Sequence, residues 1–349
     1  MKNRHLLAAT MLLTLTAAAP GNDMIPSAQI VRSAPALDAL IDPTAPIRKL
    51  GEGMKWTEGP VWIADGQYVL FSDVPGNRIH KWSKADGLSV FMDPSGGNGP
   101  ASPAFREPGT NGLKPGRPGE VIAADHGSRA VVAIDLAKKT KRLLATHFNG
   151  KKFNSPNDVV VAADGAIWFT DPPYGLEGIN DSPLKEQPVN GVYRLAPDGK
   201  ITLVEAGLSF PNGIALSPDG KTLYVAVSDP KRAIIMAYDV RGSTLSRPRV
   251  FADMTSLVGD KMPGLPDGMT VDAKGNLFAT GPGGVHIIAP SGKELGWISL
   301  GKAAANCTFG GPDGHTLFIT ASDMLVAVRT KTRGTPAHQP AAFAKGERG

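Results

Sequence analysis

Short apolar runs alternate with turn residues along most of the chain. Six segments begin with a residue that carries a side-chain oxygen, continue with a few apolar residues, and reach a glycine eight residues later. A second run, rich in β-branched and aromatic residues, follows each glycine, as in 68–73, 167–171 and 223–228. Runs of this kind between turn signals predict β-strands. Chance would rarely keep one offset through six copies, so the chain contains an internal repeat. The opening residues are Glu58, Asn111, Asn157, Asn212, Asp267 and Asn306, and the glycines are Gly66, Gly119, Gly165, Gly220, Gly275 and Gly314.

Each repeat has room for four short strands. Third and fourth runs follow the first two, for instance 191–195 and 201–204, and successive copies begin 39 to 55 residues apart. Four strands at this period are typical of one blade of a β-propeller. The sequence therefore predicts an all-β, six-bladed β-propeller with four-stranded blades and a central metal site. A pair of β-sandwiches is the alternative fold, but it gives no reason for sixfold repetition.

The last repeat contains only three runs, over about 304–329. The apolar-polar alternation of 46–50, near the other end of the chain, can supply the missing fourth strand. Pairing these two segments would close the ring and remove open sheet edges.

The innermost strand of every propeller blade lines the central channel, so the six opening residues should meet in one ring. All six side chains offer oxygen, and two of them, Glu58 and Asp267, are carboxylates. Such hard donors suit Ca²⁺, or less well Mg²⁺, rather than Zn²⁺. The alternative is that Asn-Gly and Asp-Gly are only turn residues; a glutamate at the same position, ahead of a strand, argues against it. For Asn111 and Asn306, a capping or structural hydrogen bond is an equal alternative to metal binding.

Four ordered motifs resemble those of the gluconolactonase/regucalcin (senescence marker protein) family of six-bladed propellers. They are WTEGPVW (56–62), FNSPNDVVVAADGAIWFTDPPYG (153–175), FPNGIALSPDGKTLYV (210–225) and PDGMTVDAKGNLFATGPGGVHI (266–287). The resemblance covers about residues 46–330, nearly the whole mature chain.

The resemblance implies a divalent cation, usually Ca²⁺, held by Glu58, Asn212 and Asp267. Asn157 matches a residue that is a fourth metal ligand in some relatives and a substrate contact in others. Asp267 also matches the residue assigned as catalytic base or nucleophile. The implied function is hydrolysis of a small-molecule sugar lactone, with the cation polarising the carbonyl and Asp267 as general base. An arylesterase or phosphotriesterase at the same site, and a non-catalytic propeller that binds a sugar or a partner protein, are the alternatives.

Further candidate substrate-binding residues are Asn111, His126 and Tyr174, beside Asn157. His126 ends a second strand near the expected channel wall, although an ordinary surface or core histidine is the alternative. Tyr174 follows two prolines near the expected mouth of the pocket. The stretch 94–119 is rich in Pro and Gly, and we expect a surface loop that overhangs one face, either as part of the site or as a bland insertion.

The first residues have the pattern of a signal peptide. Lys2 and Arg4 precede an apolar run, 6–16, that is too short to span a bilayer, and small residues follow at 17–19. The expected division is a signal peptide over 1–20, a linker over 21–45, the propeller over 46–330 and a disordered tail over 331–349. We therefore expect an exported protein, periplasmic or secreted, with no membrane anchor, that is a monomer or a weak oligomer.

Composition narrows the remaining function classes. The chain has 41 Gly and 30 Pro, which favours many tight turns over a helical bundle. The formal net charge is +5, but no basic stretch is interleaved with stacking aromatics, so we expect no nucleic-acid partner. The single cysteine, Cys307, excludes an internal disulfide. The sequence contains no GxxxxGK[ST], HExxH or CxxC motif, which leaves the oxygen ring as the candidate for chemistry.

Overall fold

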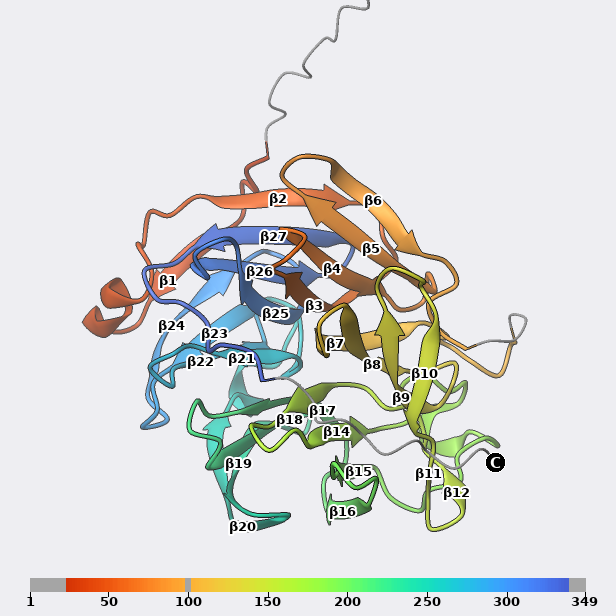
Figure 1. Ribbon diagram of the computed structural model, residues 1–349. Coiled ribbons are helices and arrows are strands. Elements are labelled where there is room, and N and C mark those ends of the chain that lie inside the picture. The colour runs from red at the N-terminus through yellow and green to blue at the C-terminus, as the bar shows by residue number, and fades with distance from the viewer. Residues whose placement is uncertain (1–22, 98–101, 339–349) are drawn as a thin grey trace, which may run out of the picture.

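The computed structural model describes residues 23–97 and 102–338. Six antiparallel sheets of four or five strands follow one another around a central axis (Figure 1). The predicted six-bladed β-propeller is confirmed. The predicted signal peptide, 1–20, lies outside the described residues.

Four blades are built from four consecutive strands each. Blade 1 contains β3 (Thr57–Ile63), β4 (Tyr68–Asp73), β5 (Arg78–Ser83) and β6 (Gly87–Met92). Blade 2 contains β7 (Thr110–Pro115), β8 (Glu120–Asp125), β9 (Ala130–Asp135) and β10 (Lys141–Ala145). Blade 3 contains β13 (Val159–Val161), β14 (Ile167–Asp171), β15 (Gly191–Leu195) and β16 (Ile201–Glu205). Blade 4 contains β17 (Pro211–Leu216), β18 (Thr222–Asp229), β19 (Arg232–Arg241) and β20 (Thr244–Asp253).

The last two blades each include a strand from the N-terminal part of the chain. Blade 5 contains β21 (Met269–Val271), β22 (Leu277–Gly281), β23 (Gly284–Ile288), β24 (Glu294–Ser299) and β1 (Gln29–Arg32). Blade 6 contains β25 (Ala304–Gly310), β26 (Thr316–Ala321), β27 (Met324–Arg329) and β2 (Ile47–Glu52). A small sheet of β11 (His147–Phe148) and β12 (Lys151–Lys152) precedes blade 3.

Helical structure in the described part of the chain consists of three short 3₁₀ turns. They are η1 (Pro35–Ala39), η2 (Ile179–Asp181) and η3 (Thr255–Leu257). No helix among the described residues has the length and apolar character needed to cross a membrane.

The apolar core is divided among the interfaces between neighbouring blades. Each blade buries both of its faces, and one apolar cluster fills each of the six interfaces. Between blades 2 and 3, the rings of Phe153, Phe169 and Tyr193 lie 5.0–5.4 Å apart between centroids. Such contacts add to the free energy that apolar burial supplies. The interface clusters therefore hold the inner strands, and the site at the axis, in place.

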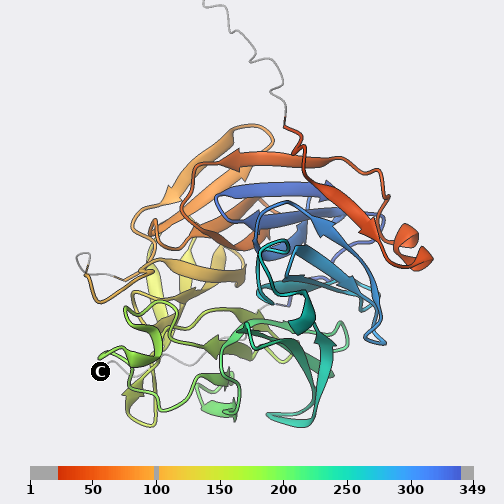
Figure 2. The same ribbon diagram turned by 180° about the vertical axis from the view of Figure 1, so that it is seen from behind.

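The ring of blades closes between the two ends of the chain. β2 pairs antiparallel with β27, with Ile47 opposite Val328. Both views show the red-orange β2 beside the blue β27 (Figures 1 and 2). The prediction that 46–50 supplies the missing strand of the last blade is confirmed.

The predicted linker over 21–45 is wrong for much of its length. β1 pairs with β24 as a fifth strand of blade 5. Leu37 in η1 and the following Ile41 are fully buried in the cluster between blades 5 and 6. The segment has no counterpart in the repeat, and its apolar runs are too short to show a strand period, which is why the sequence suggested a linker.

The predicted disordered tail is also wrong at its beginning. Thr332 is buried, and its hydroxyl donates to the Asp272 carboxylate at 2.8 Å. The Thr335 amide and hydroxyl donate to the Val271 carbonyl. This segment therefore lies along the end of β21. The rest of the predicted tail, from residue 339, lies outside the described residues.

Candidate functional site

The structure brings the six predicted ring residues together at one end of the central channel. The Asn111 amide donates to Asn157 Oδ1 at 2.9 Å, and the Asn157 amide donates to Asn212 Oδ1 at 2.6 Å. The Asn306 amide lies 3.4 Å from Glu58 Oε2. These contacts join side chains that are far apart in the sequence, and the inner strands of successive blades position them.

Glycines beside the ring residues allow this convergence. A Cβ at Gly213 would lie 2.1 Å from the Asp267 carbonyl oxygen of the next blade. A Cβ at Gly59 would lie 2.1 Å from the Asn111 carbonyl oxygen, and one at Gly268 would lie 1.9 Å from the Asn306 side chain. The Glu-Gly, Asn-Gly and Asp-Gly pairs therefore mark close approach between blades, not hairpin turns.

Two carboxylates of the ring are close enough to repel one another. Burial and then the neighbouring Asp158 raise the pKa of Glu58. Burial, followed by the charges of Glu58 and Asp158, raises the pKa of Asp267 well above its ordinary value. Charged carboxylates in such a place are costly unless a cation compensates them.

The donor set fits a hard divalent cation. Asn111 Oδ1 is buried without a hydrogen-bond partner, which leaves an oxygen available at the ring. Within 23–97 and 102–338, no group of three or more His, Cys, Asp or Glu side chains could hold a metal ion. A cation at the axis would therefore be bound by two carboxylates together with amide oxygens, a set that suits Ca²⁺ or Mg²⁺.

A cavity of about 810 Å³ opens above the ring. Glu58, Asn111, Asn157, Asn212 and Asp267 form its floor. The predicted residue Tyr174 lines its wall, with its ring stacked on Phe210 at 5.8 Å. Burial raises the pKa of Tyr174, so its buried hydroxyl, which has no partner, remains a hydrogen-bond donor. The cavity is large enough for a sugar-sized ligand.

His126 lies behind the cavity instead of lining it. The side chain is fully buried, with Nδ1 3.2 Å from the Glu107 carbonyl oxygen and the ring against Gly175. Burial lowers the pKa of His126, which favours the neutral imidazole. In this position His126 supports the loop that carries Glu107, and a direct contact with substrate stays a prediction.

Comparison with known proteins identifies the family. Residues 56–323 match the family described as "SMP-30/Gluconolactonase/LRE-like region". The chain belongs to this family. It is 45% identical over 335 residues to a gluconolactonase of Zymomonas mobilis, a match that covers 94% of both chains.

Two further relatives extend the comparison. The pentonolactonase XacC of Haloferax volcanii is 25% identical over 76% of this chain and 81% of its own length. A solved gluconolactonase structure from Xanthomonas campestris superposes with a TM-score of 0.73 and 34% identity, over 86% of this chain and 95% of that one. The family assignment agrees with the resemblance noted from the motifs.

The cavity also contains residues that the motifs did not indicate. Arg106 and Glu107 form an ion pair at its mouth, with side chains 46% and 14% exposed. Both belong to the Pro/Gly-rich stretch 94–119, and they line the cavity above the ring. The Ser228 hydroxyl accepts a hydrogen bond from the Asn212 amide at 2.8 Å and donates to the Pro266 carbonyl. For Arg106 and Glu107, the only indication in the sequence was that they lie in an irregular loop expected near the site.

Hydroxyls near the ends of the second strands of blades 1, 3 and 5 fasten each of these blades to the next one. Ser72 Oγ donates to the Asn111 carbonyl at 2.8 Å, and Thr170 Oγ1 donates to the Asn212 carbonyl at 2.7 Å. Thr280 Oγ1 reaches the Ala305 carbonyl in the same way. These bonds hold the backbone at or beside the ring residues. A hydroxyl at this repeated position was visible in the sequence, but nothing there showed its partner.

Replacing Thr170 by Val is expected to lower the free energy of unfolding by about 1–3 kcal/mol, because two buried backbone groups lose their partner. The Thr170 hydroxyl donates to the Asn212 carbonyl and accepts from the Asp158 amide at 3.2 Å. Urea denaturation measures the change. Thr202→Val, at a half-buried position on β16, is the control and should shift stability by less than about 0.5 kcal/mol. Equal effects of the two changes would contradict the fastening role.

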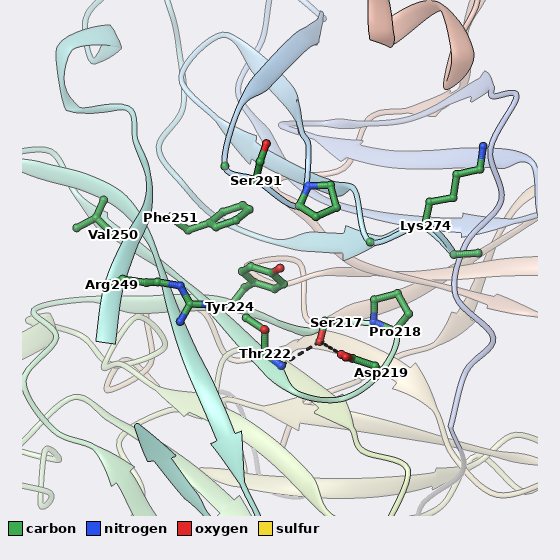
Figure 3. Close-up of a pocket in the computed structure, with 14 residues that line it drawn as sticks. Ser217, Pro218, Asp219, Thr222, Tyr224, Arg249, Val250, Phe251, Lys274 and Ser291 are labelled. Carbon is green, nitrogen blue, oxygen red and sulfur yellow. Dashed lines mark hydrogen bonds between the residues drawn. The ribbon is translucent and has the colours of Figure 1, made fainter. Parts of the chain in front are cut away.

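Another cavity, of about 510 Å³, lies between blades 4 and 5 (Figure 3). Several of its polar groups have partners within turns and strands. The Ser217 hydroxyl accepts from the Thr222 amide and donates to Asp219, and Arg249 pairs with Asp239 at 2.8 Å. The channel cavity differs because it contains opposed carboxylates and unpartnered polar atoms, so it is the candidate active site.

Proposed function

We propose that this protein is a metal-dependent hydrolase that opens sugar lactones. The observation that carries the proposal is the convergence of two mutually repelling carboxylates, Glu58 and Asp267, with amide oxygens beneath one sugar-sized cavity. The similarity to a gluconolactonase and a pentonolactonase supports the lactone class.

Four side chains would hold the cation, which we propose to be Ca²⁺: Glu58, Asn157, Asn212 and Asp267. Their oxygen atoms and two negative charges suit this ion. When bound, a divalent cation supplies Lewis-acid polarisation of the lactone carbonyl and stabilises negative charge on its oxygen.

The protein's own groups orient the substrate and move the proton. Tyr174 forms part of the cavity wall, and the Arg106–Glu107 pair presents donors and acceptors at the mouth to the sugar hydroxyls. The Asp267 carboxylate takes a proton from the attacking water as a general base. Buried Gly268 and the Thr280 hydroxyl, which donates to the Gly268 carbonyl at 3.0 Å, fix the backbone next to Asp267.

The reaction balances with water as the only co-reactant. The water oxygen forms a bond to the carbonyl carbon while its proton passes to Asp267. The bond between the carbonyl carbon and the ring oxygen then breaks, and the ring oxygen receives the proton from Asp267 to become a hydroxyl. The aldonic acid product is ionised at neutral pH, so each turnover releases one proton to solvent.

Proton release tests this function. With glucono-1,5-lactone, the wild-type protein with Ca²⁺ is expected to release protons faster than the uncatalysed reaction. A chelator should abolish the difference, and added Ca²⁺ should restore it. Other lactones, aryl esters and organophosphates run in parallel separate lactonase from arylesterase or phosphotriesterase activity. Absence of catalysis on every substrate would favour a non-catalytic binding propeller, and full activity in chelator would contradict the metal dependence.

A further inference from the structure

A lysine lines the channel just beyond the ring. Lys114 belongs to β7, three residues after Asn111, and its side chain is only 17% exposed. It lines a second cavity of about 750 Å³ at the other end of the channel. No described residue lines both this cavity and the one above the ring. Lys114 therefore approaches the ring from the side opposite to the substrate cavity.

The partner of Lys114 is a buried carboxylate outside the ring. Lys114 Nζ lies 4.0 Å from Asp158 Oδ1, and the Asp158 side chain is 1% exposed. Asp158 Oδ1 also accepts from the Val159 amide at 2.9 Å, and Oδ2 accepts from the Ile214 amide at 3.2 Å. Burial raises the pKa of Asp158 above its ordinary value, whereas Lys114 and these two amide donors act in the opposite direction and favour the ionised carboxylate.

Asp158 lies close enough to the ring to act on its charges. A Cβ at Gly112, the residue after Asn111, would lie 2.2 Å from Asp158 Oδ1, so this carboxylate lies against the ring. Burial first, and then charges that include Asp158, raise the pKa of Glu58 and of Asp267. The Lys114 charge in turn opposes the effect of burial on the pKa of Asp158, and on the pKa of the Cys307 thiol in blade 6. The three carboxylates and the lysine therefore form one electrostatic unit across the channel.

We propose that Lys114 sets the charge of the central site by neutralising Asp158, so that Glu58 and Asp267 leave a net charge of minus two to match one divalent cation. This inference rests on the metal site of the proposed function. Three carboxylates alone would overcharge the site for a single Ca²⁺ and would destabilise the metal-free protein. Lys114 is thus a positioning residue that acts through Asp158, with no contact to substrate.

The two single substitutions should change calcium affinity in opposite directions. Lys114→Met leaves Asp158 uncompensated, so the dissociation constant for Ca²⁺ should fall by about 10-fold. The metal-free variant should have a lower Tm than wild type, and Ca²⁺ should raise that Tm by more than it raises the wild-type value. Asp158→Asn leaves the lysine uncompensated, so the dissociation constant should rise by about 10-fold.

The double variant tests the pairing. Lys114→Met combined with Asp158→Asn removes both charges together, so its calcium affinity should return to within about 3-fold of wild type, a non-additive result. Lys114→Arg keeps the charge and is the matched control, with affinity near the wild-type value. Calorimetric titration with Ca²⁺ and thermal unfolding with and without Ca²⁺ provide the readouts, using the whole protein.

The outcomes separate this inference from the proposed function. A merely structural lysine would lower stability without tightening calcium binding, so unchanged or weaker binding by Lys114→Met overturns the inference. Additive effects in the double variant overturn it as well. If Lys114→Met does not fold, the calcium affinities of Asp158→Asn and of the double variant still test the inference. Asp158→Asn should bind Ca²⁺ more weakly than wild type, and the double variant should bind it about as tightly as wild type. A wild type that binds Ca²⁺ but opens no lactone contradicts the proposed reaction alone, and a wild type that binds no Ca²⁺ contradicts both.

Discussion

Replacing Asp267 by Asn is expected to lower kcat for lactone hydrolysis by about 1,000-fold or more, because an amide cannot take the proton from the attacking water. The substitution also removes one of the two carboxylates proposed to hold the cation. Initial rates of proton release at saturating Ca²⁺ measure the effect. Retention of full hydrolysis would show that Asp267 is not the base.

Stability measurements separate this loss from misfolding. Asp267 and Glu58 repel one another in the metal-free protein, so Asp267→Asn should unfold at the same temperature as wild type or at a higher one without Ca²⁺. Asp198→Asn, an exposed turn position in blade 3, is the matched control and should leave kcat and Tm unchanged.

Heavy-oxygen water distinguishes the two roles open to Asp267. If it acts as a base, a single turnover places the label only in the product carboxylate. If it attacks the lactone carbonyl as a nucleophile, an anhydride forms between Asp267 and the opened substrate, and attack of water on the Asp267 carboxyl carbon leaves label in the protein. We expect no label in the protein.

Replacing Gly213 by Ala is expected to lower the free energy of unfolding by about 3 kcal/mol, because the new methyl group overpacks a rigid contact. The Cβ would lie 2.1 Å from the Asp267 carbonyl oxygen and 2.7 Å from its carbonyl carbon. Relief of this clash must move the backbone of Asp267, and a displacement of a catalytic group by about 1 Å can cost about 100-fold in rate. Urea denaturation and kcat/KM for lactone test both effects.

Gly207→Ala provides the matched comparison. Gly207 is exposed, and a Cβ there would meet only the end of the Glu205 side chain, at 3.3 Å. Its stability should change by less than about 0.5 kcal/mol. A Gly213→Ala protein with normal stability and activity would show that blades 4 and 5 can separate slightly at the axis without harm.

The repeat made the fold and the ring accessible from the sequence alone. The offset between Glu58 and Gly66 recurs in every copy, and strands 68–73 and 167–171 were predicted at the bounds that the structure shows. The ring followed because equivalent positions must meet at the axis. The closing strand, 46–50, could be predicted because the last repeat contains only three strands.

Features outside the repeat could not be predicted from the sequence in this way. β1 and η1 use the same kinds of residue as a linker, and only their tertiary contacts make them part of blades 5 and 6. Arg106 and Glu107 reach the cavity through an irregular loop that has no period to follow. Lys114 occupies a strand position where only the neighbouring blade reveals its partner, Asp158. His126 was placed near the channel wall, but its burial behind the loop depends on packing that spacing does not encode.

The pairing of β2 with β27 affects the order in which the protein can be completed. β2 leaves the ribosome early, but its partner, Met324–Arg329, is made near the end of synthesis. Until then the nascent chain has an unpaired strand at each side of an open ring of sheets, and such edges favour wrong association. A chain that ends before residue 324 lacks β27, so β2 has no partner and the ring of blades cannot close. Such a shortened product should therefore be a target for proteolysis, although it contains the strands of the first five blades.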